Sequence, residues 1–193
     1  MPAGSAVFSS AYAGSVDYYA AMCRCGMVTI DPNEKAGKHS RIHNHCRIIG
    51  PNGQQTLAIP IEHATRSGES VVRDIRIAEH GGWRRVHWGA IFSAYGRTPF
   101  FEYIAPELQA LYNRGDCWLF DFNMALHELI VEFLDLPIIT MVGGDSGGNR
   151  GLTSQNQCRP YHQIWADRFG FVPGLSILDL LMNVGREAIL AMR

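Results

Sequence analysis

The chain has 193 residues, of which 47% are hydrophobic and 18% charged, a composition typical of a folded globular protein and unlike that of a disordered one. Its formal net charge of -1 argues against bulk nucleic-acid binding, which requires clustered Lys and Arg. The length suits one domain with a substantial core, and we expect a single domain over residues 1–193.

Cysteine usage and the amino terminus predict the compartment. The five cysteines are odd in number and scattered, and none form a Cys-x-x-Cys pair, which indicates reduced thiols. Met1-Pro2-Ala3-Gly4 lacks the basic start and apolar run of a signal peptide. No apolar segment approaches the roughly 20 residues that span a bilayer. We therefore expect a cytoplasmic protein with no membrane span.

The first elements in chain order predict a strand, a short helix and a second strand. Residues 7–12 are short and apolar, and Ser15 is placed to cap a helix over residues 16–22. Gly26 ends this helix, and residues 27–31 have the composition of a β-strand. This order favours parallel pairing of the two strands.

A hairpin is the next predicted element. Residues 46–49 and 56–61 are apolar runs separated by the turn 50–53, whose Asn-Gly pair is among the strongest short hairpin signals. Residues 71–78 alternate apolar and polar side chains and predict a further strand.

The second half is predicted to be mainly helical. Apolar residues recur with a period of about 3.6 over residues 83–94 and 120–134, and 107–112 supports a short helix. Residues 137–142 predict a returning strand, and Ser176 opens a last helix with a pattern like a capping box. The expected fold class is α/β, with a mixed sheet opened by the strand–helix–strand unit and a helix-rich second half.

A polar, glycine-rich loop is predicted over residues 143–156. Its Gly144-Asp145-Ser146-Gly147-Gly148 matches the nucleophile segment of trypsin-like serine proteases. That chemistry also needs a histidine base and a buried aspartate from an all-β double barrel, which this helix-rich chain does not predict. A turn is therefore the favoured interpretation, with a ligand-contacting loop as the alternative.

The segment His43-Asn44-His45-Cys46 has the residue types of a metal site. If the segment is extended, His43 and His45 share one face while Cys46 points away. Two ligands on one face leave zinc short of the three or four that it needs, so no metal site is predicted. A polar strand facing a substrate and a solvated edge remain the alternatives.

His87 is the candidate general acid or base. It lies on the predicted helix 83–94, and the unperturbed pKa of histidine, near 6.5, suits proton transfer near neutral pH. The alternative is a structural histidine on a helix. Asn123 and His127 are neighbours at i, i+4 on another predicted helix and are candidates for the same cleft.

Several blocks of sequence occur in a recognisable order. They are Ser10-Ala11-Tyr12 with Tyr18-Tyr19, Val28-Thr29-Ile30-Asp31 with Glu34, His43 to Ile48, Asn52-Gly53 with Leu57 to Ile61, Trp83…His87-Trp88…Tyr95…Pro99-Phe100-Phe101…Tyr103, and Phe171-Val172-Pro173…Leu175 to Leu181. In this order the blocks resemble the WbqC-like family of bacterial proteins. His43 and His45 stand where the family pattern tends to have arginines, so a pH-dependent cation replaces a fixed guanidinium fork.

The resemblance implies a link to bacterial surface-polysaccharide (O-antigen) biosynthesis and the transfer of an acyl or aminoacyl group. It supplies neither a catalytic set nor a cofactor, so the cofactor stays unknown. Local clusters of basic residues in a neutral protein fit an anionic small molecule better than a polyanion. They comprise Lys35, Lys38, Arg41 and Arg47, and then Arg73, Arg76, Arg84, Arg85 and Arg97.

Two functions follow as hypotheses. In the first, the protein is a transferase that acts on an activated sugar or acyl donor. Arg47, with His43 and His45, holds the anionic group, His87 is the acid or base, and Tyr95, Asn44 and Asn123 line the cleft. In the second, it is a non-catalytic binding or assembly protein whose aromatic segment 83–103 forms a partner surface. Convergence of Arg47, Asn44 and His87 on a concave pocket favours the enzyme, whereas an exposed flat aromatic patch favours the binding protein.

Overall fold

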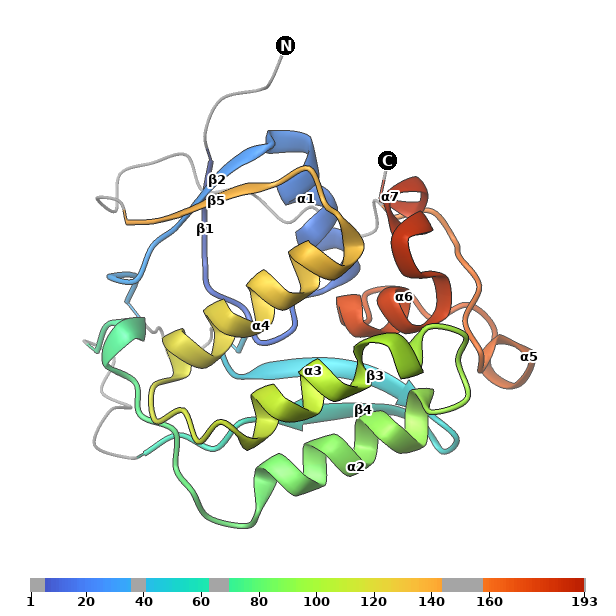
Figure 1. Ribbon diagram of the computed structural model, residues 1–193, viewed down its shortest axis with the longest axis horizontal. Coiled ribbons are helices and arrows are strands. Elements are labelled where there is room, and N and C mark those ends of the chain that lie inside the picture. The colour runs from blue at the N-terminus through green and yellow to red at the C-terminus, as the bar shows by residue number, and fades with distance from the viewer. Residues whose placement is uncertain (1–5, 36–40, 63–69, 144–157, 193) are drawn as a thin grey trace.

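A computed structural model describes residues 6–35, 41–62, 70–143 and 158–192 (Figure 1). In this part of the chain the strands form a three-stranded parallel sheet, in the order β1-β2-β5, and a two-stranded antiparallel sheet of β3 and β4. In the view of Figure 1 the parallel sheet is at the top and the hairpin below it, with α4 seen between them. Parallel and antiparallel sheets beside many helices confirm the predicted α/β class.

The predicted strand–helix–strand opening is present. Its elements are β1 (Ala6–Phe8), α1 (Val16–Cys25) and β2 (Met27–Ile30), and β1 pairs with β2 in parallel. The Ser15 side chain accepts a hydrogen bond from the backbone N–H of Tyr18, as expected of a helix N-cap. Gly26 ends the helix with a positive φ of 74°, a conformation that glycine adopts without strain. The predicted returning strand is β5 (Ile139–Val142), which pairs with β2 in parallel.

The predicted hairpin is also confirmed. It comprises β3 (His45–Gly50) and β4 (Gly53–Ala58), with Gly50 paired to Gly53 across the turn. Gly53 has a φ of 101°, which requires glycine at this position of the turn.

The strand predicted over residues 71–78 is wrong. Val72–Asp74 form a 3₁₀-helix, η2, and the segment contributes only isolated β-bridges within the described residues. The buried side chains explain the difference, because Val72 and Ile75 are three positions apart. Hydrogen bonds from the Asp74 and Ile75 N–H groups to the carbonyls three residues earlier close this turn.

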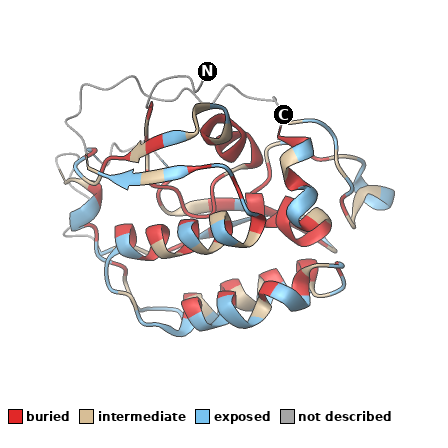
Figure 2. Cartoon of the chain, turned by 45° about the horizontal axis from the view of Figure 1, so that its top comes forward, coloured by how far each residue is buried: buried red, intermediate tan, exposed pale blue. Residues whose placement is uncertain are grey.

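The predicted helices of the second half are present. They are α2 (Trp83–Tyr95), α3 (Phe101–Asn113), α4 (Leu119–Leu134) and α6 (Ile177–Val184), and short α5 (Ala166–Phe169), η3 (Gly185–Glu187) and α7 (Ala188–Ala191) complete the elements. Helix α3 begins well before the predicted residue 107, because an apolar face runs through Phe101, Ile104 and Leu108. The helix therefore includes Pro106, which disfavours a helix interior. Figure 2 shows that buried residues line the inward faces of these helices and much of α1.

Hydrogen bonds join the residues in front of α1 to those in front of α6, although about 160 positions separate them in sequence. The Val16 N–H donates to the Leu175 carbonyl at 3.0 Å, and the Ile177 N–H donates to the Gly14 carbonyl at 2.8 Å. The Ser176 hydroxyl donates to the Ala13 carbonyl at 2.7 Å and accepts from the Leu178 N–H, as the N-cap of α6. We call this junction of residues 13–16 with residues 174–177 the clasp. It holds the two helix starts together.

Replacing Ser176 with Ala removes both the link to Ala13 and the cap of α6. We expect S176A to lower the free energy of unfolding by about 1–3 kcal/mol in denaturant titrations, since a buried carbonyl loses its partner and a helix loses its cap. The matched control is S93A, at an exposed position of α2. Equal stability of S176A and S93A would contradict this role of the clasp.

Candidate functional site

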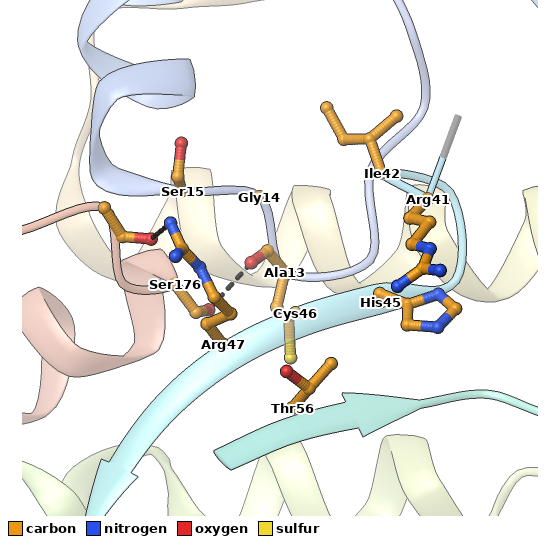
Figure 3. Close-up of a pocket in the computed structure, with 11 residues that line it drawn as sticks. Ala13, Gly14, Ser15, Arg41, Ile42, His45, Cys46, Arg47, Thr56 and Ser176 are labelled. Atoms are coloured by element: carbon orange, nitrogen blue, oxygen red, sulfur yellow. Dashed lines mark hydrogen bonds between the residues drawn. The ribbon is translucent and has the colours of Figure 1, made fainter. Parts of the chain in front are cut away.

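A pocket of about 310 Å³ opens where the clasp meets the start of β3 (Figure 3). Its lining comes from the clasp, from the turn that leads into β3, and from both strands of the hairpin. The lining residues are Ala13, Gly14, Ser15, Arg41, Ile42, His45, Cys46, Arg47, Thr56, Gly174 and Ser176. Figure 3 shows Arg47, Ser15 and Ser176 toward one end and Arg41 and His45 toward the other.

The clasp side of the pocket holds a strained backbone. Ala13 has a φ of 42°, in the left-handed region that is unfavourable for residues other than glycine. A Cβ on the next residue, Gly14, would lie 2.6 Å from the Tyr18 ring, so only glycine fits there. The Ser176 bond to the Ala13 carbonyl holds this conformation in place.

Arg47 supplies the cation at the clasp end. Its Nη2 donates to the Gly174 carbonyl at 2.9 Å, and the Ser176 N–H donates to the Arg47 carbonyl at 2.7 Å. A Cβ on Gly174 would lie 2.7 Å from Nη2, so the glycine permits this close approach. One bond of the guanidinium fork to Gly174 leaves further N–H donors for a ligand.

The first turn of α1 offers the pocket few free N–H donors, and its main electrostatic contribution is the helix dipole. The Val16 N–H donates to Leu175 and the Tyr18 N–H donates to Ser15, so these donors of the first turn are already used. Asp17 in the same turn offsets the positive end of the helix dipole. The positive charge at this pocket therefore comes mainly from the arginine side chains.

Arg41 and His45 lie together at the other end of the pocket (Figure 3). Burial lowers the pKa of His45, and the positive charge of Arg41 lowers it further. The His45 Nδ1 lies 2.8 Å from the Asn44 Oδ1, and the Asn44 Nδ2 donates to the Ile59 carbonyl at 3.0 Å.

Two of the side chains in the lining, Cys46 and Ser176, are poor nucleophiles. Burial raises the pKa of the Cys46 thiol, which disfavours the reactive thiolate. The Ser176 hydroxyl is committed to the Ala13 carbonyl and the Leu178 N–H. Beside these two side chains, the pocket offers the cations Arg41 and Arg47 and the imidazole of His45.

His87 lies outside this lining. It is 4% exposed, its Nδ1 lies 2.8 Å from the Tyr12 hydroxyl, and the Tyr12 hydroxyl lies 2.5 Å from that of Tyr112. Burial lowers the pKa of His87 to about 4, against a smaller opposite effect of a hydrogen bond with the Ala58 backbone. His87 thus connects to the pocket through Tyr12, the residue next to Ala13.

Tyr95 and Asn123 are buried behind the hairpin and the turn before it. The Tyr95 hydroxyl accepts a 3.4 Å hydrogen bond from the Ile49 N–H. The Asn123 Nδ2 donates to the His43 carbonyl at 2.7 Å, which fixes the turn that carries Asn44 and His45. Of the predicted site residues, the structure therefore brings His45 and Arg47 to the pocket, places Asn44 directly against His45, and leaves His87, Tyr95 and Asn123 in supporting positions.

His43 does not share a face with His45. The strand begins only at His45, and His43 lies in the preceding turn, so the alternation expected of an extended segment does not apply. The His43 Nδ1 lies 2.8 Å from the Ser10 carbonyl, and its Nε2 lies 4.0 Å from the Glu34 carboxylate. Within the ranges that the structure describes, no group of three or more His, Cys, Asp or Glu side chains is placed to hold a metal ion.

Comparison with known protein families decides the family. The family model described as the WbqC-like protein family matches residues 10–149 and 145–191. The chain belongs to this family. No curated protein and no solved structure matches the chain. In this WbqC-like chain the first matched range contains residues 13–16 and 41–47, and the second contains residues 174–177. The pocket is therefore lined by residues from both matched ranges.

Several lining residues of the WbqC-like pocket were not singled out by sequence reasoning. Ser15 and Ser176 were recognised only as helix caps, and Gly174 had no local signal. Arg41 appeared only within a basic cluster. The Asp-Ser motif at residues 144–148 and the predicted loop from residue 144 to residue 156 lie outside the described residues. No helix of the described ranges is long and apolar enough to cross a membrane.

The aromatic segment 83–103 is divided between core and surface. Trp83 and Phe101 are buried, whereas Phe92 and Tyr103 are 58% and 71% exposed. Trp83 packs edge-on against His87 at 5.1 Å between ring centroids, which places the start of α2 in the core. This segment is therefore not one flat exposed patch.

Buried histidines predict how stability depends on pH. Burial lowers the pKa of His127 to about 4, so between pH 6.5 and 4 the unfolded chain binds a proton that the folded chain does not. The contribution of neutral His127 to the free energy of unfolding is therefore complete above pH 6.5. It falls by about 3 kcal/mol as the pH decreases to 4.

We expect H127Q to reduce the fall in unfolding free energy over that pH range by a similar amount. Denaturant titrations at several pH values measure it, with H80Q, at an exposed position, as the matched substitution. The slope of unfolding free energy against pH is compared between H127Q and the wild type, because Asp179 also contributes to it. Burial raises the pKa of Asp179 to about 6, so protonation of this residue stabilises the folded chain as the pH falls through this range. An unchanged slope in H127Q would contradict the assignment.

Proposed function

We propose that this WbqC-like protein is a cytoplasmic transferase of bacterial surface-polysaccharide biosynthesis, acting on an anionic activated acyl, aminoacyl or sugar donor. The observation that carries the proposal is the pair of arginines, Arg41 and Arg47, on the lining of one concave pocket. A guanidinium fork binds phosphate or carboxylate through paired N–H donors, and partial enclosure strengthens that attraction.

Activated donors carry a leaving group that departs as an anion. Arg47 is placed by the Gly174 carbonyl and by the backbone of β3, so its guanidinium is partly preorganised before any ligand binds. A held cation stabilises negative charge that develops on the leaving oxygen. In the proposal Arg47 binds this group, and Arg41 and His45 face the opposite part of the ligand.

The buried polar residues act behind this surface. Asn123 fixes the turn at His43, and Tyr95 supports β3 at Ile49. The acid–base role of His87 stays a prediction, and in this conformation it acts through the Tyr12 hydroxyl. Turnover by H87Q, once a donor is known, tests it, and undiminished turnover removes His87 from the reaction.

A second candidate function rests on the exposed part of the aromatic segment. Val86 and Phe92 on α2 and Tyr103 on α3 are each more than half exposed. They suit a partner surface of a binding or assembly protein. Because Trp83 and Phe101 are buried, this surface is smaller than the sequence predicted. Of Arg47, Asn44 and His87, only Arg47 lines the pocket, so our preference for the transferase rests on the two arginines of the lining.

Ligand binding to the native state tests the proposal. We expect a thermal-shift screen of nucleotide sugars, phosphorylated sugars and acyl phosphates to raise the melting temperature of the wild-type protein with at least one compound. R47Q should bind that compound about 10- to 100-fold more weakly, because a charge-assisted hydrogen bond is lost.

R85Q, which removes an exposed arginine of α2 away from the pocket, is the matched control and should bind as the wild type does. Full binding by R47Q, or equal loss in R85Q, would place the ligand elsewhere.

A further inference from the structure

We propose that His45 is the general base of this pocket and that Asn44 is the positioning residue that fixes its tautomer. The inference rests on the proposed function for its substrate, which is an acceptor with an O–H or N–H group. The arrangement of His45 and Asn44 itself stands on geometry that is independent of any ligand.

The tautomer follows from the bonds of Asn44. Its Nδ2 donates to the Ile59 carbonyl at 3.0 Å, which identifies the other side-chain atom as the oxygen Oδ1. Oδ1 only accepts, and it lies 2.8 Å from the His45 Nδ1. Nδ1 must therefore carry the hydrogen of the neutral ring, and Nε2 is left with a free lone pair.

The backbone makes Asn44 a rigid support. The Ile59 N–H donates to the Asn44 carbonyl at 2.8 Å, so Asn44 and Ile59 are joined through both backbone and side chain. The next residue, His45, begins β3 and pairs with Ala58 of β4. A base whose orientation is fixed by a second residue on a sheet edge is the arrangement that efficient proton transfer requires.

The charges around His45 keep its ring neutral. Partial burial and the adjacent Arg41 both lower its pKa from the usual value. At pH 7 the ring therefore accepts a proton, as a base must.

The three histidines that are buried in the described part of the chain are less suitable as the base than the half-buried His45. His87 is bonded to Tyr12 and the Ala58 backbone, and His127 lies against Tyr19 and Thr140. His43 faces the Ser10 carbonyl and Glu34. Among the histidines within the described ranges, His45 is the one that lines the pocket.

The proposed step balances without a further reactant. The acceptor oxygen or nitrogen attacks the electrophilic carbon of the donor, while its proton passes to the His45 Nε2. The bond between that carbon and the leaving oxygen breaks, and the oxygen keeps the electron pair as an anion held by Arg47. The proton on His45 then leaves to solvent. The protein needs no nucleophile of its own, in agreement with the protonated Cys46 and the committed Ser176.

Nitrogen NMR of the ¹⁵N-labelled full chain tests the tautomer directly, with the His45 signals assigned by their loss in H45Q. At pH 7 the wild type should show a protonated Nδ1 and an unprotonated Nε2, the reverse of the form that free imidazole side chains prefer. N44D retains an acceptor and should keep this tautomer, whereas N44L removes the acceptor and should lose it.

A protonated Nε2 in the wild type, or the same tautomer in N44L, would overturn the inference. Amide spectra of each variant show whether it remains folded. If N44L does not fold, the wild-type tautomer and its retention in N44D still decide the inference, because loss of the tautomer in N44D would overturn it. When the His45 nitrogen signals are followed as a function of pH, R41Q should raise the pKa of His45. An unchanged pKa would argue against the proximity of Arg41 to the ring.

Titration with inorganic pyrophosphate separates this inference from the proposed function. Pyrophosphate binding should be about 10- to 100-fold weaker in R47Q, while the His45 tautomer in that variant is unchanged. Lack of pyrophosphate binding by the wild type would count against the anion site alone.

With a donor identified, H45Q should lower turnover by about 10²- to 10⁴-fold with little change in donor affinity, and full turnover would refute the role of His45 as the base.

Discussion

The hydrogen bonds of the clasp are the constraint on which the rest of the site depends. They join residues 13–16 to residues 174–177, and through the Ser176 N–H they bring β3 to the same place. Without them the strained backbone of Ala13 has no support, Gly174 no longer holds Arg47, and the pocket loses one side. The clasp also caps α6, so local helix stability and the geometry of the site depend on the same residue, Ser176.

The polar groups behind the pocket differ from those that line it in burial and in charge. His87 and His127 are buried and neutral, and they form hydrogen bonds with tyrosine or threonine neighbours. Burying such groups is unfavourable unless their partners are present, so they define one packing of the core at the expense of stability in acid. The lining instead carries partly exposed cations, Arg41 and Arg47, which keep donors for a ligand. Structural support of the core and the proposed binding are thereby assigned to two different sets of residues.

Local signals in the sequence predicted most of the elements, because they depend on neighbouring residues. The Ser15 cap, the Gly26 stop and the Asn-Gly turn each act within a few positions, and the parallel β1–β2 pairing follows from them. The error at 71–78 arose because the spacing of Val72 and Ile75 closes a 3₁₀ turn. The pocket could not be predicted, since Gly174 and Ser176 meet Ala13 and Arg47 only through tertiary contacts. His87 stands out in the sequence as a candidate acid or base because it lies on an aromatic helix. The inward face of that helix, which carries His87, belongs to the core.

The central claim is that the pocket formed by the clasp and β3 is where this WbqC-like protein binds an anionic ligand. Amide chemical-shift mapping during titration with the best compound of the ligand screen tests it most directly, because every described segment reports at once. We expect the perturbed amides to cluster at Gly14, Ser15, Arg47, Gly174 and Ser176. Perturbations confined to α2 and α3 around Phe92 and Tyr103, with the clasp unaffected, would contradict it and favour the partner surface.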